Sequence, residues 1–337
     1  MKIAIVGAGA IGSRIAAHLS QSGTTCTLVD AWAEHVDALN RDGLRLRRKD
    51  LDQRHPVRAF TFQRPPTEKF DIVLLAVRSD ATANALPLVQ DILAPDGFVV
   101  SCQNGLNEEE IAKWVGAERT AGCSMIFGAR LTAPAEVTVL EGPDTLRLGE
   151  FKGAVTPRIT ALAKTLSACG TVSTTDNLLG YRWMKLVLNA TGNPLLLLSG
   201  LDGESLHDRA SARRLIIALT SEIMQVALCD GAQPEPLLEY SAHAWTTAQA
   251  TDSVQLHEAL QQHGKTLGKR RLSMVADFEA RGRTEIGEIT GKVLEKALRL
   301  RCPAPLNAEI LRHVRAVEAG VIKPGLTILD ALASEVI

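Results

Sequence analysis

The chain begins with a short apolar run, Lys2 to Val6, that stops at a glycine-rich segment, Gly7 to Gly12. A continuous apolar run of this length is typical of a strand that is buried on both faces of a parallel sheet. Apolar residues then recur at helical spacing from Ser13 to Ser20, Gly23 ends that segment, and a second strand-like run spans Cys26 to Val29. The pattern predicts a β-α-β unit at the start of the chain.

The glycine-rich segment has the spacing of a dinucleotide-binding fingerprint. Its first glycine lets the chain turn out of the strand, its second lets the backbone approach a pyrophosphate, and its third lets the helix pack on the strand. The helix N-terminus favours phosphate, and an acid at the end of the second strand binds ribose hydroxyls. We therefore predict a dinucleotide site made by Gly7, Ala8, Gly9, Ala10, Ile11, Gly12 and Asp30. The alternative is a β-α-β unit without a ligand.

Strand-like and helical segments continue to alternate over the first half of the chain. Strands are predicted over residues 70–77 and 97–102, and the second is followed by Gln103-Asn104-Gly105-Leu106. Because strand carboxyl ends face the ligand crevice of a doubly wound sheet, Arg78 and Asn104 are expected near the cofactor. The alternatives are a surface ion pair between Arg78 and Asp80 and a simple tight turn at Asn104. We also predict helices over 31–40, 81–93 and 157–167, a strand over 121–128, an antiparallel pair of 136–140 with 145–149, and a short strand over 171–173.

From Asp176 onward, apolar residues recur at helical spacing. Pro194 lacks a backbone donor, so the segment Gly192-Asn193-Pro194 is expected to break the first helix. The expected helices are 177–198, 208–229, 236–265, 273–280, 285–299 and 306–319. We predict an α/β Rossmann-type N-terminal domain over residues 1–174 and an all-α C-terminal domain over residues 175–337.

Composition limits the classes of partner. The 337 residues carry a net charge of −1, which gives no electrostatic case for nucleic acid or an anionic membrane. The basic cluster at 45–49 alternates with Leu44 and Leu46 and is followed by Asp50 and Asp52, as in a solvated hairpin. No apolar run approaches the ~18 residues of a membrane span, and the apolar N-terminus is the fingerprint itself, not a signal peptide. Six cysteines without a C-x-x-C pair indicate neither a metal site nor a disulfide framework, and they fit a reducing cytoplasm.

A second informative stretch lies at the start of the helical half. Lys185, Asn189 and Asn193 stand at i, i+4 and i+8, so a lysine and two amides share one helical face. Polar groups on an otherwise apolar, buried helix need hydrogen-bond partners, because burial without them costs roughly several kcal/mol. Those partners are either a substrate or a structural network. Further on, Glu285 follows Thr284 and is expected in the first turn of a helix, where it is either a site residue or an acid that complements the dipole.

Taken together, four motifs resemble the ketopantoate reductase (2-dehydropantoate 2-reductase) family. They are GAGAIG at the N-terminus, Q-N-G-L after the sheet strand, W-M-K-L-x-x-N-x-x-x-N, and S-M-x-x-D with R-T-E-I. The resemblance covers nearly the whole chain and implies NAD(P)H-dependent reduction of a 2-keto acid, ketopantoate to pantoate, in pantothenate biosynthesis. It further implies that Lys185 is the general acid, because hydride arriving at a ketone creates an alkoxide that needs a proton donor. By resemblance, Glu285 contacts lysine and substrate, and the substrate is bound by Asn104, Asn189, Asn193 and Ser273.

The chain departs from the family pattern at several positions. Where members that prefer NADPH carry a basic residue, this sequence has Asp30-Ala31-Trp32, and a carboxylate there repels a 2′-phosphate but accepts bonds from free ribose hydroxyls. We therefore expect NAD(H) to be favoured over NADP(H). Arg78 replaces a family lysine, and Asp202 and Arg270 replace family asparagines on the substrate side, where an arginine can bind a carboxylate with both nitrogens.

Three functions remain open from the sequence. The first is a 2-keto acid reductase of the ketopantoate type. The second is an NAD-dependent catabolic dehydrogenase of a different hydroxy acid, which Asp30, Asp202 and Arg270 favour. The third is a nucleotide sensor without activity, against which the retained Lys185 and Glu285 argue. The helix at 208–229 is either a homodimer contact or ordinary core.

Overall fold

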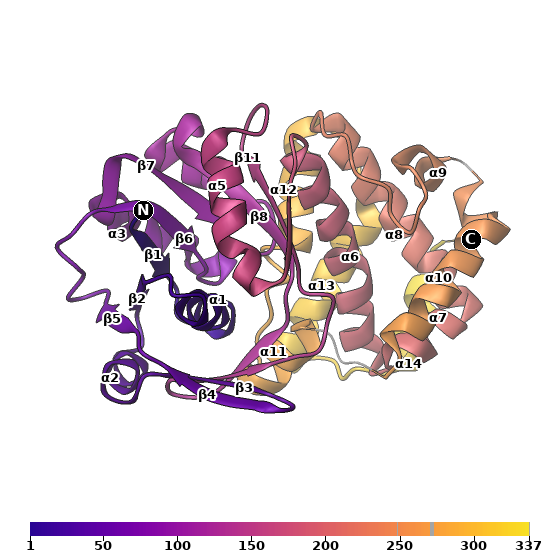
Figure 1. Cartoon of the computed structure of the whole chain (residues 1–337). Helices are drawn as coiled ribbons and strands as arrows, with labels where there is room; N and C mark the ends of the chain where they lie inside the picture. Colours follow the sequence, from indigo (N-terminus) through magenta and orange to yellow (C-terminus); the bar gives the residue numbers. More distant parts are fainter. Residues whose placement is uncertain (248, 270–272, 337) are drawn as a thin grey trace. The chain divides into compact units, whose positions relative to one another are not determined.

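The computed structural model describes residues 1–247, 249–269 and 273–336 (Figure 1). The chain divides into two compact units, Met1–Leu178 and Leu179–Ile337. The first unit contains the β-strands and the second is helical, which confirms the predicted fold class. The predicted domain boundary, between residues 174 and 175, stays a prediction.

The main sheet of the first unit has eight strands in the order β12-β11-β8-β7-β6-β1-β2-β5. All neighbouring strands are parallel except β11 and β8. The chain builds β1 and then β2 on one side, and it crosses to the other side of β1 to build β6. The strands are β1 (Ile3–Val6), β2 (Cys26–Asp30), β5 (Arg58–Thr61), β6 (Phe70–Leu75), β7 (Leu93–Ser101), β8 (Thr120–Ile126), β11 (Thr145–Glu150) and β12 (Thr171–Thr174).

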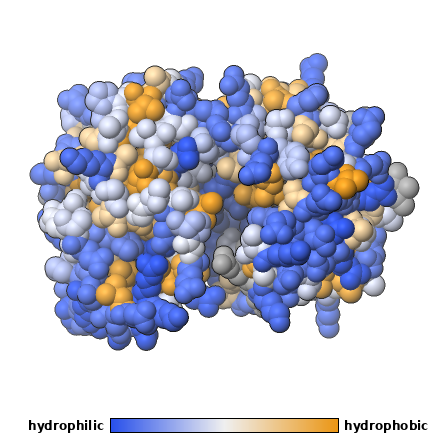
Figure 2. All heavy atoms as spheres, turned by 45° about the vertical axis from the view of Figure 1, so that its right-hand side comes forward, coloured by the Kyte–Doolittle hydropathy of each residue, from blue (hydrophilic) through white to orange (hydrophobic). Residues whose placement is uncertain are grey.

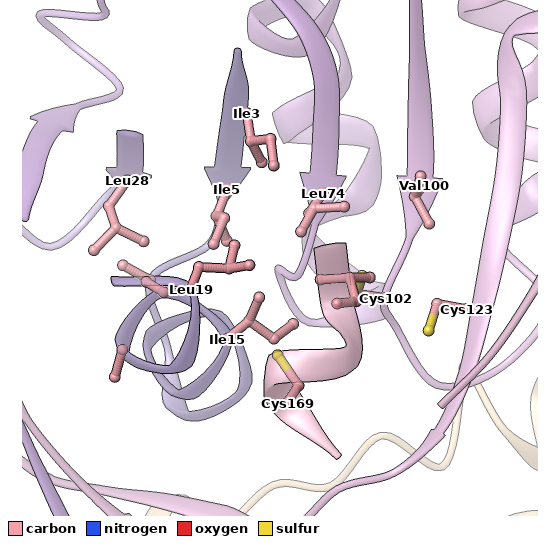
Figure 3. Close-up of a cluster of buried hydrophobic side chains, with 14 of the residues drawn as sticks. Ile3, Ile5, Ile15, Leu19, Leu28, Leu74, Val100, Cys102, Cys123 and Cys169 are labelled. Atoms are coloured by element: carbon pink, nitrogen blue, oxygen red, sulfur yellow. The ribbon is translucent and has the colours of Figure 1, made fainter. Parts of the chain in front are cut away.

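Both faces of this sheet are covered, which is why a central strand such as β1 is buried and apolar at every position. Alternate residues point to opposite faces: Ile3 and Ile5 belong to the cluster that includes α1 (Ala10–Gln21) and α5 (Pro157–Leu166), whereas Ala4 and Val6 belong to the cluster with α3 (Thr82–Ile92) and α4 (Glu108–Val115). Figure 3 shows the first of these clusters, with Ile15 and Leu19 of α1 directed at the strands. Helix α2 (Ala33–Asp42) adds Val36 and Leu39 to the same cluster.

A second sheet in this unit corrects one predicted pairing. It has the order β4-β3-β10-β9, built from β3 (Leu44–Arg48), β4 (Leu51–His55), β9 (Ala129–Ala133) and β10 (Glu136–Val139). The predicted hairpin at 45–52 is confirmed as β3 and β4, with Arg45 and Asp52 paired at 2.6 Å. The predicted pair of 136–140 with 145–149 is wrong, because β10 pairs with β3 and β9 while β11 pairs with β8.

The chain between β10 and β11 explains this separation. Asp144 has a positive φ of 46°, and its carboxylate lies 2.6 Å from the guanidinium of Arg14 on α1. The Arg14 side chain is fully buried; it also donates to the Gly128 carbonyl at 2.8 Å and lies over the Phe127 ring. A buried cation must be paired and hydrogen-bonded, so Arg14 fixes where the chain leaves the second sheet and turns into β11.

The second unit is organised around α8 (Ala210–Cys229). This helix packs against several others and is largely buried, so it is part of the core of its own unit, while the homodimer contact stays a prediction. Glu222 on α8 accepts the backbone N–H groups of Leu306 and Asn307 and so caps α13 with a carboxylate. The other helices are α6 (Leu178–Ser199), α7 (Gly203–Asp208), α9 (Ala242–Thr246), α10 (Val254–Leu267), α11 (Ser273–Arg281), α12 (Thr290–Leu300), α13 (Pro305–Glu318) and α14 (Leu326–Ser334).

Two helix predictions in this unit are wrong. Helix α6 continues through Pro194 to Ser199, because Leu195 and Leu198 are fully buried and their packing outweighs the loss of one backbone bond. The predicted helix over 236–265 is instead a loop, α9, a short 3₁₀ turn and α10. Positive φ values at Leu238 and Glu239 stop helix formation there, and Ser241 and Ser253 then cap two new helices.

On the face shown in Figure 2, hydrophilic residues cover most of the surface and hydrophobic residues form small separate groups. Within the described ranges, no helix is both long and apolar enough to cross a membrane.

Candidate active site

The turn after β1 has the geometry that a dinucleotide fingerprint requires. Gly7 has a φ of +99°, and a Cβ on it would lie 2.5 Å from the backbone nitrogen of Val77. A Cβ on Gly12 would lie 2.0 Å from the carbonyl oxygen of Gly7, so the helix can approach the strand only with glycine here. No atom lies within 4 Å of the corresponding position at Gly9. The backbone at Gly9 therefore faces open space through which a pyrophosphate can approach.

Asp30 is part of this turn. Its Oδ2 accepts the backbone N–H of Ala8 at 2.6 Å, and its Oδ1 accepts that of Trp32 at 2.9 Å. Each carboxylate oxygen has a second lone pair, so the group retains capacity for hydroxyl donors. The predicted positions at the ends of β1 and β2 are thus brought together.

The other predicted cofactor residues reach the same edge of the sheet. Val77, which closes against Gly7, directly precedes Arg78, and the Ser79 hydroxyl donates to the Asn104 carbonyl at 2.7 Å. The turn after β1, Arg78 after β6 and Asn104 after β7 therefore lie along the carboxyl ends of adjacent strands. This is the position of ligand sites in open α/β sheets, where the strand order reverses. The cradle at Gly9, the uncapped α1 N-terminus and the Asp30 carboxylate all fit a dinucleotide.

Hydrogen bonds and an ion pair with neighbouring residues hold both Arg78 and Asn104. The Arg78 guanidinium lies 3.3 Å from the Asp80 carboxylate, so the ion pair considered from the sequence is present. The Asn104 carbonyl also accepts the Asn107 amide at 2.6 Å, and the nearby Gln103 amide donates to the Thr82 hydroxyl at 2.7 Å. Sequence reasoning missed Ser79, Gln103 and Asn107 as positioning residues. Their signal was available, since each follows a predicted strand and is polar.

His35 is a further residue that the sequence did not single out. It is buried on α2, and its Nδ1 accepts the backbone N–H of Ala135 at 2.9 Å. Its Nε2 lies 2.9 Å from the Ala8 carbonyl oxygen. Because Nδ1 is an acceptor, Nε2 carries the proton and donates to Ala8. The imidazole thus links the glycine turn to the β9–β10 turn.

In the second unit, the polar stripe lies on α6 as predicted. Lys185, Asn189 and Asn193 all fall within Leu178–Ser199, and their spacing places them on one face. Lys185 and Asn189 are half-buried, and Asn193 is buried. The stripe is therefore built into a continuous helix rather than at a helix break.

A buried ion pair fixes the same helix. The Trp183 indole N–H donates to the Asp230 carboxylate at 3.2 Å, and the Lys296 ammonium of α12 lies 2.7 Å from it. Lys296 is 1% exposed and Asp230 is 7% exposed. Asp230, the residue after the last turn of α8, is thus the point where α6, α8 and α12 are joined. Trp183 precedes Lys185 by two residues, so this network holds the backbone that carries the lysine.

The position of Glu285 corrects a prediction. It does not lie in the first turn of a helix, because it precedes a turn over residues 286–289 and α12 begins at Thr290. Its carbonyl accepts the N–H groups of Glu288 and Ile289, both at 3.0 Å. Before it, Thr284 donates its backbone N–H at 2.6 Å and its hydroxyl at 2.7 Å to one oxygen of Glu318. The Glu285 loop is therefore held by α13, and the dipole interpretation no longer applies.

The remaining predicted substrate residues are Asp202, Ser273 and Arg270. Asp202 is the N-cap of α7, where its Oδ1 accepts the Ser205 N–H at 2.8 Å and these bonds lower its pKa. Ser273 is exposed at the first turn of α11. Arg270 lies outside the described residues. The roles of all three toward a substrate stay predictions.

The side chains that could bind a metal in the part of the chain that the structure describes are those of His, Cys, Asp and Glu. No group of three or more His, Cys, Asp or Glu side chains there is arranged to hold a metal ion. All six cysteines are free, and burial raises the pKa of Cys26 and Cys169 to about 12.

With the geometry established, comparison with known sequences identifies the family. The model of the ketopantoate reductase PanE/ApbA family matches residues 3–153, and the model of its C-terminal domain matches residues 177–318. The chain belongs to the ketopantoate reductase family. As a member, it is an NAD(P)-dependent oxidoreductase that acts on a CH–OH group.

Individual relatives within and beside the ketopantoate reductase family cover nearly the whole chain. It is 27% identical over 320 residues to the 2-dehydropantoate 2-reductase of Pyrococcus horikoshii, which covers 95% of this chain and 98% of that protein. The crystal structure of 2-dehydropantoate 2-reductase from Geobacter metallireducens is 26% identical, with a TM-score of 0.79 and coverage of 94% of this chain and 99% of that one. The structure of D-mandelate dehydrogenase with NADH and anilino(oxo)acetate has a TM-score of 0.81 at 24% identity, with coverage of 95% and 99%, and shows the shared fold.

Proposed function

We propose that this ketopantoate reductase family member reduces the 2-keto group of ketopantoate, or of a closely similar 2-keto acid, with Lys185 as the general acid. The observation that carries the proposal is the polar stripe of Lys185, Asn189 and Asn193 on one face of α6, in a chain whose two halves both match the family. A bound nicotinamide dinucleotide supplies the hydride. The protein must then stabilise and protonate the resulting alkoxide.

Each residue has a distinct proposed task. Lys185 supplies positive charge and the proton at the developing alkoxide oxygen, since a lysine is charged at neutral pH. Glu285 contacts the lysine and the substrate from the loop that Glu318 holds. Asn104, Asn189 and Asn193 donate amide hydrogens that orient the reacting groups. Ser273 binds the substrate carboxylate, Arg270 can bind it with both nitrogens, and Asp202 contributes to the substrate pocket.

The proposed cofactor preference is NADH over NADPH. Its support is the placement of Asp30, whose carboxylate sits at the glycine turn and accepts the Ala8 N–H at 2.6 Å. A carboxylate there repels a 2′-phosphate and can accept bonds from free 2′- and 3′-hydroxyls. Ala8, Ala10 and Ile11 bind through their backbone, Gly7, Gly9 and Gly12 give the phosphates room, and Arg78 binds a phosphate or ribose oxygen.

The deciding experiment crosses a substrate panel with both cofactors. Purified protein is assayed with ketopantoate and with other 2-keto acids, using NADH and NADPH in separate reactions, and oxidation of the cofactor is followed by absorbance. We expect NADH oxidation with ketopantoate. If ketopantoate gives no oxidation of either cofactor while another 2-keto acid does, ketopantoate is not the substrate.

The second candidate is a dehydrogenase of a different hydroxy acid that works with NAD+. The departures at Asp30, Asp202 and Arg270 favour it, and the fold is shared with a D-mandelate dehydrogenase whose structure holds NADH. The same panel run in the oxidative direction, with NAD+ and 2-hydroxy acids, separates the two candidates.

A cytoplasmic location and a homodimer also remain proposals. Light scattering measures the oligomeric state directly.

A further inference from the structure

His35 occupies a position that neither the fingerprint nor the family resemblance assigns. It lies on α2, outside the glycine turn, yet it touches the backbone in the middle of that turn. The Ala135 N–H donates to Nδ1 at 2.9 Å, and Nε2 donates to the Ala8 carbonyl at 2.9 Å. The Ala8 N–H in turn donates to Asp30 at 2.6 Å. The Ala8 carbonyl also accepts the Ser13 hydroxyl of α1 at 2.6 Å, so side chains from three elements hold the peptide groups on both sides of Ala8.

We propose that His35 is a positioning residue for dinucleotide binding, which holds the phosphate-binding turn in its binding conformation only while the imidazole is neutral. The proposal rests on the assignment of that turn to the dinucleotide. It adds His35 to the residues that shape the turn, and it makes dinucleotide binding depend on the protonation state of His35.

Ala135, the residue that donates to His35, is itself held in place for this contact. Ala135 lies in the turn between β9 and β10 and has a φ of +56°, a conformation that non-glycine residues rarely adopt. Its carbonyl accepts the backbone N–H of Arg45 at 2.8 Å, which anchors it to β3. Because the residue is fixed on both sides, its N–H points at His35 without freedom to turn away. The second sheet is thus a fixed support for the glycine turn.

Protonation of Nδ1 would break the hydrogen bond between His35 and Ala135. A protonated Nδ1 is a donor, and it would face the Ala135 N–H donor at 2.9 Å. Burial lowers the pKa of His35, and the Asp30 carboxylate and the bond to Ala8 raise it less. Glu34 precedes His35 on α2, and Glu136 follows Ala135; the Glu136 carboxylate is paired with Arg45 and Arg47. The neutral imidazole is therefore the form that the folded protein favours.

The Trp32 ring covers one face of the His35 imidazole. It stacks on the His35 ring with centroids 5.4 Å apart and planes at 14°. This contact fixes the tilt of the imidazole, so both nitrogens stay aligned with their partners. Trp32 follows Asp30 by two residues, and its backbone N–H is the second donor to that carboxylate.

Two substitutions of His35 separate the two bonds. His35→Asn places an amide near Nδ1 and can still accept from Ala135, whereas His35→Gln places one near Nε2 and can still donate to Ala8. NAD+ and ADP-ribose binding are measured by calorimetry from pH 5.5 to pH 8, with thermal unfolding as a check on folding. The matched control is His243→Gln, because His243 is an exposed histidine in the second unit.

For wild type we expect the Kd for both ligands to rise about tenfold as the pH falls, which is the size of effect of losing one buried hydrogen bond. His35→Gln should bind with a Kd that no longer changes with pH in this way, and should bind more tightly than His35→Asn, since it keeps the bond to the glycine turn. His243→Gln should match wild type.

Two results would overturn the proposal. If wild type and both folded His35 variants show the same Kd and the same pH dependence, His35 does not position the turn, while the dinucleotide assignment stands. If wild type binds neither NAD+, NADH, NADPH nor ADP-ribose, the proposed function fails, and this inference fails with it.

Discussion

The Asp30 carboxylate accepts the backbone N–H of Ala8 at 2.6 Å, so the residue proposed to choose the cofactor also shapes the turn proposed to bind its phosphates. A substitution at Asp30 therefore changes two things at once. Loss of turn geometry weakens every dinucleotide equally, whereas loss of the ribose contact weakens NADH alone. Only the ratio of the two affinities reports cofactor choice.

Accordingly, Asp30→Ala should weaken NADH by about tenfold or more, because hydrogen bonds to a charged group contribute roughly 1.5–3 kcal/mol. NADPH should lose less, since a repulsive charge near its 2′-phosphate disappears. Fluorescence titration with each cofactor gives the ratio of Kd values. Asp30→Asn is the matched variant, as it keeps one acceptor oxygen for Ala8. Equal losses for both cofactors would contradict the proposed preference for NADH.

Replacing Lys185 tests the chemical step. Lys185→Ala should lower kcat by roughly 10²–10⁴-fold, the usual contribution of a positioned acid, while leaving the Kd of the dinucleotide unchanged. Lys185→Arg keeps the positive charge and should retain substrate affinity better than alanine does. Turnover of Lys185→Ala at the wild-type rate would remove the lysine from its proposed role.

Glu318 should matter for activity although it lies on α13, away from every predicted site residue in the sequence. Glu318→Ala leaves the two Thr284 donors without their acceptor and loosens the loop that carries Glu285. We expect kcat/KM to fall about tenfold. Glu318→Gln should recover much of it, because the amide oxygen still accepts. The control Glu258→Ala, at an exposed position on α10, should leave kcat/KM unchanged. An unaffected Glu318→Ala would show that the loop does not depend on this contact.

The buried pair of Asp230 and Lys296 should dominate the stability of the second unit. Asp230→Ala leaves the Lys296 ammonium, which is 1% exposed, without its carboxylate, and breaking such a pair costs about 3–5 kcal/mol. Urea denaturation measures the free energy of unfolding. The double variant Asp230→Leu with Lys296→Met removes both charges and should recover most of the loss. A double variant as unstable as Asp230→Ala would mean that the charge imbalance is not the cause.

Stability should fall as the pH drops from 6.5 toward 4. Burial and the neighbouring His207 lower the pKa of His263 to about 4, while a histidine in the unfolded chain titrates near 6.5. Between these values the unfolded chain binds a proton that the folded chain does not, so the free energy of unfolding decreases as the pH falls. Urea denaturation at several pH values gives the slope. His263→Gln should reduce that slope, whereas the exposed His243→Gln should not.

The sheet of the first unit was predictable because its signals are local. Strands β1 and β6 contain continuous apolar runs, and glycines or polar residues after them mark the edge where ligands bind. Asp30, Arg78 and Asn104 follow from this rule without any tertiary information, and contacts in the structure join all three to one edge of the sheet. Strand β5 has no such run and was not predicted.

What could not be predicted depends on contacts between distant segments. The path from β10 to β11 is set by Arg14, which looks like an ordinary helical residue until Asp144 is placed beside it. The continuity of α6 through Pro194 depends on burial of Leu195 and Leu198, which helix propensity does not contain. The late start of α12 likewise follows from the bonds between Thr284 and Glu318, residues on different elements.

The bond from His35 to Ala135 also has a consequence for the order of folding. Ala8 and Ala135 are far apart in the chain, and β3 pairs in parallel with β10, so the support of the glycine turn involves contacts of long sequence separation. Such contacts form late, because a long loop must close before they contribute. A nascent chain that has emerged only as far as β7 already contains the whole fingerprint and Asp30, but it lacks the strand that steadies them. We therefore expect the full cofactor affinity to be reached during synthesis only after β10 has been added.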